Sequence, residues 1–268
     1  IGGLGVITVA AAFALLSGRK ISLMQRSTMQ DAISAPKVGG IVRLTRFILR
    51  GTFLIELLGT LAMLQVFCRD YGLRGVWMAM FHSISAFCNA GFDIFGGGQS
   101  MVPYADNIFL NIITCVLIFF GGIGFLVIQE LWQKKCQWKK LSMHTKVVLS
   151  VSLALIIIGT LLIKLTEPVS WLCALFHSVS TRTAGFASRP IGDFGAPALL
   201  VMIVLMFIGA SSGSTGGGIK TSTFFVLIRG IFSAATNQSE KAFHYSIPKD
   251  AFKKAAVISI LAAGVVIT

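Results

Sequence analysis

The sequence FHSISAFCNAGF at residues 81–92 decides how this chain is organised, because the closely similar sequence FHSVSTRTAGF recurs at residues 176–186. Each copy ends a mostly apolar stretch of about a dozen residues, which is too short to cross a hydrocarbon core that needs about 20. A short apolar stretch that ends in a polar glycine turn is able to enter a membrane and return to the same side. Two copies in one chain predict a pore that is assembled from repeats.

The composition indicates an integral α-helical membrane protein. The chain has 268 residues, of which 55% are hydrophobic and 12% are charged, whereas about 25% of the residues are charged in an average soluble domain. Several apolar runs approach the length of a membrane span. The chain begins inside one apolar run and stops inside another, without an initiator Met, so we expect it to be a fragment of a longer protein.

The net charge is +13, and the positions of its basic residues indicate which loops face the cytoplasm. All but five of the 23 lysine and arginine residues fall in the stretches 19–50, 134–146 and 220–254. Because cytoplasmic loops carry such an excess, we predict that the three stretches face the cytoplasm beside anionic lipid. The same distribution argues against a nucleic-acid partner.

The order of span, short re-entrant helix, glycine turn and span occurs twice. Residues 47–146 form one complete repeat and residues 147–254 form the next, each with a basic linker at its end. Residues 1–46 fit the end of an earlier copy, and residues 255–268 open a later one. Both complete copies enter from the same side, so we expect an all-α membrane fold with pseudo-rotational symmetry around a central axis.

One carboxylate lies within a predicted span. Glu56 is part of the apolar run Phe47–Phe67, and an ionisable side chain at such a depth is a functional candidate. We expect a structural role instead, in which Glu56 pairs with Arg50 or faces a neighbouring helix.

The two glycine turns suit a cation filter. A cation that crosses hydrocarbon must have its water shell replaced, and rings of backbone carbonyls do this in potassium channels. Non-helical backbone at membrane depth is tolerated where it lines a cavity, and glycine permits the backbone angles that point successive carbonyls inward. The short helix before each turn aims its partially negative end at the ion. We therefore predict that Asn89–Phe92 and Thr183–Phe186 line a cation pathway.

A second glycine-rich segment interrupts a span at residues 209–220. Such a composition cannot form a stable helix, so we predict a flexible plug below the glycine turns. The residues of this gate segment are Gly209, Ala210, Ser211, Ser212, Gly213, Ser214, Thr215, Gly216, Gly217, Gly218 and Lys220.

Two other interpretations stay open. The pattern Gly209-x-Ser211-x-Gly213 matches a nucleophile elbow, which would make the chain an intramembrane serine hydrolase that uses Ser211, with His82 or His177 as the base. A secondary ion transporter with discontinuous helices is the other alternative, although such transporters usually have inverted repeats.

The two turns resemble the filters of the Trk/Ktr/HKT superfamily of potassium transporters, whose chain holds four M1–P–M2 repeats. SAFCNAGF at residues 85–92 is similar to the second filter, and STRTAGF at residues 180–186 is similar to the third in the bacterial Ktr style. The resemblance covers essentially the whole chain and implies re-entrant pore helices and a Gly-rich break in one inner helix. The filter residues that it implies are Cys88, Asn89, Ala90, Gly91, Arg182, Thr183, Ala184 and Gly185.

The resemblance also implies a function. It implies potassium uptake across a bacterial plasma membrane by a multi-pass protein that is not an enzyme, with residues 209–220 as the gate. It implies K⁺ as the transported ion, Na⁺ as a candidate coupling ion, and no other cofactor in this chain. Bacterial membrane subunits of the family often form homodimers and pair with a cytosolic ring of nucleotide-binding regulatory subunits, for which the basic stretches 133–146 and 233–254 are candidate docking faces. The first and fourth filters are expected outside this chain.

Overall fold

The structure is a computed structural model that describes residues 41–236, 241–242, 245–246 and 249–267. The predicted end of an earlier repeat, residues 1–46, lies for the most part outside the described residues. The described part of the chain is mostly helical, as expected, and its strands are confined to one small antiparallel hairpin, β1 (Lys241–Ala242) with β2 (Tyr245–Ser246).

The first half of the described chain contains two long helices and two shorter ones. α3 (Ile41–Tyr71) leads into the short α4 (Arg74–Phe87), and a loop with the 3-10 turn η1 (Val102–Tyr104) leads on to α5 (Ile108–Ile123). α6 (Phe125–Gln133) follows α5 after a bend of 95°. α3 begins inside the basic stretch 19–50, before the predicted span Phe47–Phe67, and its residues Leu44 and Ile48 bury their side chains in the core of this half.

The second half repeats this order with a longer interruption. The 3-10 turn η2 (Trp138–Lys140) precedes α7 (Met143–Thr166), and α8 (Trp171–Ser180) is the next short helix. The 3-10 turn η3 (Ile191–Asp193) leads to α9 (Ala196–Phe207). The remaining helices are α10 (Thr221–Thr236) and α11 (Lys249–Ile267), and the gate segment lies between α9 and α10.

Polar side chains cap three of these helices at their first turn. Asn107 accepts a hydrogen bond from the backbone N–H of Leu110 at the start of α5, and Ser142 and Ser170 do the same at the starts of α7 and α8. Such caps satisfy backbone donors that a helix leaves unpaired at its N-terminus. Local sequence therefore determines where α5, α7 and α8 begin.

The long helices present apolar side chains outward. The helical residues Arg43–Tyr71 and Met143–Thr166 are each long and apolar enough to cross a membrane, and the bent pair α5–α6 is a third candidate. Phe53 on α3 is 67% exposed, and Leu165 on α7 is 81% exposed. Exposed apolar faces of this extent fit lipid rather than water, so the chain is a multi-pass membrane segment.

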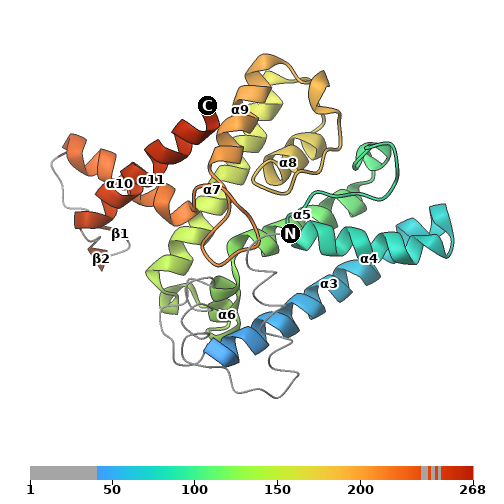
Figure 1. Ribbon diagram of the computed structural model, residues 1–268, viewed down its shortest axis with the longest axis horizontal. Coiled ribbons are helices and arrows are strands. Elements are labelled where there is room, and N and C mark those ends of the chain that lie inside the picture. The colour runs from blue at the N-terminus through green and yellow to red at the C-terminus, as the bar shows by residue number, and fades with distance from the viewer. Residues whose placement is uncertain (1–40, 237–240, 243–244, 247–248, 268) are drawn as a thin grey trace.

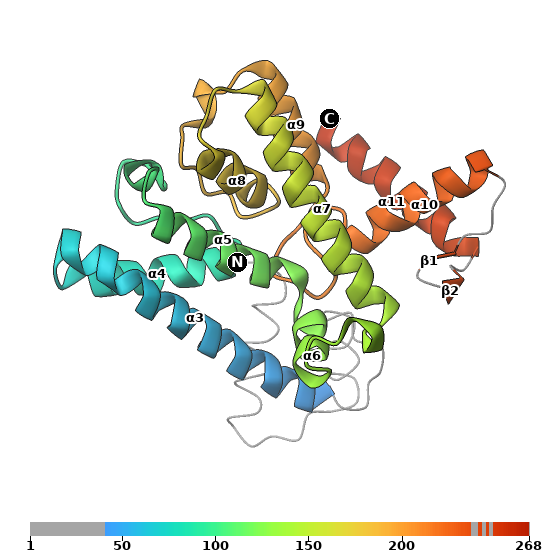
Figure 2. The same ribbon diagram turned by 180° about the vertical axis from the view of Figure 1, so that it is seen from behind.

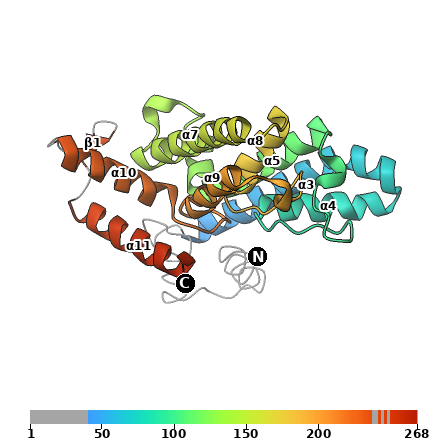
Figure 3. The ribbon, with the colours of Figure 1, turned by 90° about the horizontal axis from the view of Figure 1, so that it is seen from above.

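α5 occupies the middle of the fold. It packs against α3 and α4 of its own half and against α7 and α8 of the other half. Figure 2 shows α3 alongside α4 and α7 beside α8. Figure 3 shows a flattened arrangement, with α10 and α11 at one end and α3 and α4 at the other. The two short helices α4 and α8 thus both contact α5.

Candidate functional site

The two glycine turns meet backbone to backbone. Gly91 has a φ of +70°, and a methyl group placed on it would lie 2.2 Å from the carbonyl oxygen of Ala184 and 3.0 Å from the Cα atom of Gly185. Gly185 has a φ of +89°, and a methyl group there would lie 3.7 Å from the Cα atom of Gly91. Segments that lie far apart in the sequence thus form one site, and Gly91 is the more tightly enclosed of the two glycines.

Each turn also holds a second residue in the left-handed region. The φ of Asn89 is +51°, and that of Thr183 is +105°. Such angles are uncommon for residues with a Cβ atom and are unusual for a β-branched one. Backbone strain of this kind persists where the surrounding structure over-determines it and is concentrated at functional sites.

A serine side chain closes each turn. Ser85 Oγ donates to the carbonyl oxygen of Phe92 at 2.8 Å and accepts from the Phe92 N–H at 2.9 Å. Ser180 Oγ donates to the carbonyl oxygen of Phe186 at 2.5 Å. Both serines belong to the repeated Phe-His-Ser-x-Ser sequence, so the repeat carries the residue that fixes its own turn.

The preceding serine of each copy ties the short helix to the long helix before it. Ser83 Oγ donates to the carbonyl oxygen of Glu56 at 2.8 Å. Ser178 Oγ donates to the carbonyl oxygen of Ile156 at 2.9 Å. The two halves therefore use the same contact to hold α4 on α3 and α8 on α7.

Two glycines that the sequence analysis missed make this contact possible. A methyl group on Gly59 would lie 2.4 Å from Ser83 Oγ, and one on Gly159 would lie 2.5 Å from Ser178 Oγ. The signal was present in the sequence, because Gly-Thr-Leu occurs at residues 59–61 and again at residues 159–161. Gly-Thr-Leu is therefore a second repeated sequence, in addition to Phe-His-Ser-x-Ser.

The gate segment has no helix over residues 208–220 and rests on the bend between α5 and α6 (Figure 1). The backbone hydrogen bonds that join them run from Ser211 N–H to the Gly122 oxygen (2.9 Å), from Thr215 N–H to the Gly121 oxygen (3.1 Å), and from Phe125 N–H to the Gly213 oxygen (3.0 Å). Gly124, at a φ of +89°, lets the segment approach, since a methyl group there would lie 2.6 Å from the Ser212 oxygen.

The same segment contacts both glycine turns. A methyl group on Gly216 would lie 2.3 Å from Thr183 Oγ1 and 3.1 Å from the side-chain amide of Asn89. Thr215 Oγ1 donates to the carbonyl oxygen of Phe87, the last residue of α4, at 3.1 Å. Residues 215–216 therefore lie directly against the turns, although they belong to a different part of the chain.

The serine of the elbow pattern is not placed for catalysis. Ser211 is fully buried, and its Oγ atom lies 2.8 Å from Thr221 Oγ1. The His82 ring packs on Phe186, with 4.7 Å between the ring centroids, and the His177 ring packs on Phe194 at 4.8 Å. Neither histidine contacts Ser211 within the described residues, so the pair that a serine hydrolase needs is not assembled.

Charged side chains flank the two turns differently. Glu56 contacts Cys88, the residue before the first turn, with 3.8 Å between Cys88 Sγ and Glu56 Oε1. The ion pairs of the described residues do not join Glu56 to Arg50, because side chains six residues apart point about 120° away from each other around a helix. Glu56 instead faces the end of the neighbouring helix α4, which was the other alternative. Arg182 occupies the equivalent position before the second turn. Its side chain is buried and points toward α7 and Gly209.

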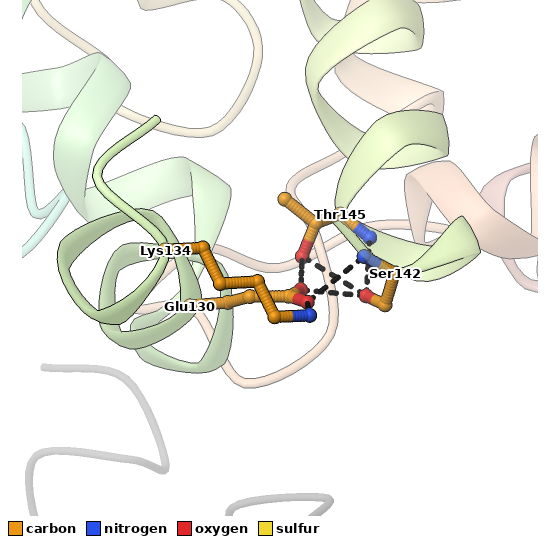
Figure 4. A network of polar contacts seen from close by, with 4 residues as sticks. All are labelled: Glu130, Lys134, Ser142 and Thr145. Carbon is orange, nitrogen blue, oxygen red and sulfur yellow. Dashed lines mark hydrogen bonds and ion pairs between the residues drawn. The ribbon is translucent and has the colours of Figure 1, made fainter. Parts of the chain in front are cut away.

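A polar network fixes the corner between α6 and α7 beside the gate segment (Figure 4). Glu130 accepts hydrogen bonds from the backbone N–H and the Oγ atom of Ser142, at 2.8 Å and 2.6 Å, and also from Thr145 Oγ1. Lys134 forms an ion pair with the same carboxylate. A pocket beside this network is lined by Glu130, His144 and Ser212, so the network adjoins the gate segment.

The chain resembles a family of transport proteins in sequence. The family model described as TrkH, cation transport protein, matches residues 1–167 and 138–267. The Ktr system potassium uptake protein B of Vibrio alginolyticus is 38% identical over 243 residues, which cover 84% of this chain and 52% of that protein. The potassium/sodium uptake protein NtpJ of Enterococcus hirae is 34% identical over 240 residues, which cover 85% of this chain and 52% of that protein.

A solved structure shares the fold. The potassium transporter TrkH from Vibrio parahaemolyticus superposes with a TM-score of 0.66 at 20% identity, over 94% of this chain and 53% of that one. The chain thus spans about half the length of the relatives that it matches. All of these relatives are named as transport proteins and none as an enzyme.

Proposed function

The chain belongs to the TrkH family of cation transport proteins, and on this premise we propose that it forms part of a potassium-selective pore. The relatives are named for potassium uptake, or for potassium and sodium uptake. The observation that carries the proposal is the meeting of two glycine turns from separate parts of the chain, with a non-helical segment lying against both. This arrangement suits a filter with a gate beneath it.

The filter would be lined by the backbone of Cys88–Gly91 and Arg182–Gly185. Four residues there, two in each turn, have a positive φ, and this backbone conformation allows successive carbonyl groups to turn toward one axis. Carbonyl oxygens in such a ring replace the hydration shell of a potassium ion. In this proposal α3, α4 and α5–α6 form one M1–P–M2 unit, and α7, α8 and α9–α10 form the next.

The gate would be the segment 209–220. It is held on the α5–α6 bend by three backbone hydrogen bonds, each worth about 1 kcal/mol net. A total of about 3 kcal/mol is small enough for a bound partner to offset, so opening requires only a shift between two states of the segment. In the proposal, release of this segment frees the space beneath Thr183 and Asn89.

We propose the partners and the setting from the resemblance to the family. The protein would act in a bacterial plasma membrane as a homodimer, together with a cytosolic ring of nucleotide-binding regulatory subunits. The basic stretches 133–146 and 233–254 are the proposed docking faces for that ring. Sodium is the candidate coupling ion. The alternative mechanism is a secondary ion transporter with discontinuous helices.

The test is cation flux into liposomes that carry the full-length protein, potassium against sodium, with and without Gly185→Ser. We expect potassium-selective flux that the substitution weakens or opens to sodium, because the new side chain strains a backbone with a φ of +89°. The matched control is Gly192→Ser in η3, where a methyl group would meet no atom within 4 Å. Absence of flux from folded wild-type protein with its cytosolic partner would overturn the proposal, and so would equal effects of the two substitutions.

A further inference from the structure

We propose that the guanidinium group of Arg182 couples the second filter turn to the gate segment and holds that segment in its resting position. This inference rests on the proposed pore function. It concerns the side chain of Arg182, whereas the filter uses only its backbone. Arg182 is therefore a positioning residue, which acts on the pathway through the groups that it contacts.

The side chain bridges three parts of the fold. Its Nη1 atom lies 3.3 Å from the carbonyl oxygen of Ser152 in α7, and its Nη2 atom lies 3.4 Å from Ser152 Oγ. The same Nη2 atom lies 3.5 Å from the carbonyl oxygen of Gly209, the first residue of the gate segment. One side chain thus connects the turn, the span behind it and the start of the gate.

The charge of Arg182 is not balanced by a carboxylate within the described residues. The ion pairs found there join Lys134 to Glu130 and Arg189 to Glu167. Arg182 is only 9% exposed, and its Nε atom has no hydrogen-bond partner in this part of the chain. An unpaired buried charge is strongly unfavourable, and intramembrane charges mark functional positions.

The contacts of Arg182 are loose enough to change. Hydrogen bonds between N–H groups and oxygen usually measure 2.7–3.2 Å, and all three contacts of the guanidinium are longer. A cavity of about 20 Å³ adjoins Arg182, Ser152, Asn89 and Ala210, which is room for about one water molecule. The guanidinium can therefore exchange the Gly209 oxygen for water when the gate segment moves.

The position of Arg182 in the chain explains how such a movement reaches the filter. The next residue is Thr183, whose Oγ1 atom lies against Gly216, farther along the gate segment. The segment thus contacts the second turn at Gly209 through Arg182 and at Gly216 through Thr183. A displacement of the segment changes both contacts together.

The experiment measures potassium flux and the potassium-to-sodium flux ratio in liposomes with the full-length protein, without the regulatory subunit. We expect Arg182→Gln to raise potassium flux about tenfold, the population shift that corresponds to losing one hydrogen bond to a charged group, while the flux ratio stays unchanged. Arg182→Lys should give an intermediate flux, because an ammonium group cannot span two acceptors as a guanidinium does. Arg189→Gln is the matched control, since it removes the same charge from the connection before η3, where the side chain bonds the Asp193 oxygen and faces Glu167.

The inference is overturned if Arg182→Gln alters the flux ratio without raising flux, which would restrict its role to the shape of the turn. It is also overturned if the variant behaves like Arg189→Gln. Should Arg182→Gln fail to fold, Ser152→Ala removes one acceptor with a smaller perturbation and should raise flux by less, and unchanged flux in that variant counts against the inference. A lack of flux in the wild-type protein even after its cytosolic partner is added would instead be a failure of the proposed function.

Discussion

The two halves of the chain, residues 41–133 and 143–236, share their packing contacts but differ in their charges. Ser83 bonds the Glu56 carbonyl in the first half just as Ser178 bonds the Ile156 carbonyl in the second. The side chain at this point is a carboxylate in the first half and an isoleucine in the second. The residue that opens the turn differs too, since Cys88 is replaced by Arg182. Repeated residues therefore build the scaffold, and the residues that differ distinguish the two sides of the site.

The halves also differ in how their last helix is broken. In the first half the break is a single bend of 95° at Gly124 between α5 and α6. In the second half α9 and α10 are separated by the whole segment 208–220. The long break rests on the short one through backbone hydrogen bonds. The breaks at equivalent positions of the two halves therefore contact each other: the non-helical segment of the second half packs on the bend of the first.

The largest expected effect tests whether the two turns are equivalent. Gly91→Ala should abolish potassium flux and lower the free energy of unfolding by roughly 3 kcal/mol, because strain of about 1–2 kcal/mol adds to overpacking of about 1–3 kcal/mol. Gly185→Ala should lower the free energy of unfolding by the backbone strain alone, since the nearest atom to the new methyl group would be 3.7 Å away. Thermal unfolding in detergent, together with liposome flux, measures both quantities.

The control for this comparison is Gly98→Ala. Gly98 has a φ of +65° and open space around it, so the substitution introduces strain alone and should leave potassium flux unchanged. If Gly91→Ala proved no more damaging to stability than Gly98→Ala, the close approach of the two turns would be wrong.

An intermediate effect is expected where the gate segment packs on the α5–α6 bend. Gly124→Ala would place a methyl group 2.6 Å from the Ser212 oxygen, at φ 89° and ψ 148°, a backbone region that costs other residues about 1–3 kcal/mol. We expect the gate segment to loosen and resting potassium flux to rise by up to about tenfold. Gly122→Ala is the matched control, because its nearest contact would be an ordinary 3.5 Å to the Asn89 amide. Equal flux in the two variants would argue against the gate segment resting on this bend.

The smallest expected effect concerns the shared scaffold. Ser83→Ala and Ser178→Ala each remove one hydrogen bond to a span, so each should lower the free energy of unfolding by about 1 kcal/mol. Thr166→Ala, which removes a bond to the Leu162 carbonyl at the exposed end of α7, should cost less. A large difference between the two serine variants in denaturant titrations would show that the halves are not packed alike.

Sequence reasoning reached the family and much of the layout of this chain. The resemblance to the potassium transporter superfamily is confirmed by the family match, and the mostly helical membrane fold follows from the apolar runs. The role of Gly59 and Gly159 was missed, since the Gly-Thr-Leu pair is short and lies inside apolar helices. Of the two structural roles expected for Glu56, the contact with a neighbouring helix is found at Cys88, and the pairing with Arg50 is not among the ion pairs of the described residues. The β1–β2 hairpin was not expected in the polar linker.

The sequence by itself determined the features that depend on local chemistry: apolar runs long enough for lipid, serine and asparagine caps, and glycines where the backbone adopts a positive φ. Only the tertiary structure decided which distant groups meet. The contact of Gly91 with Ala184, the docking of Ser211 on Gly122, and the direction of the Arg182 side chain each join segments from different helices. Such contacts depend on how α5 packs against α7 and α8 of the other half, and no local pattern encodes that packing.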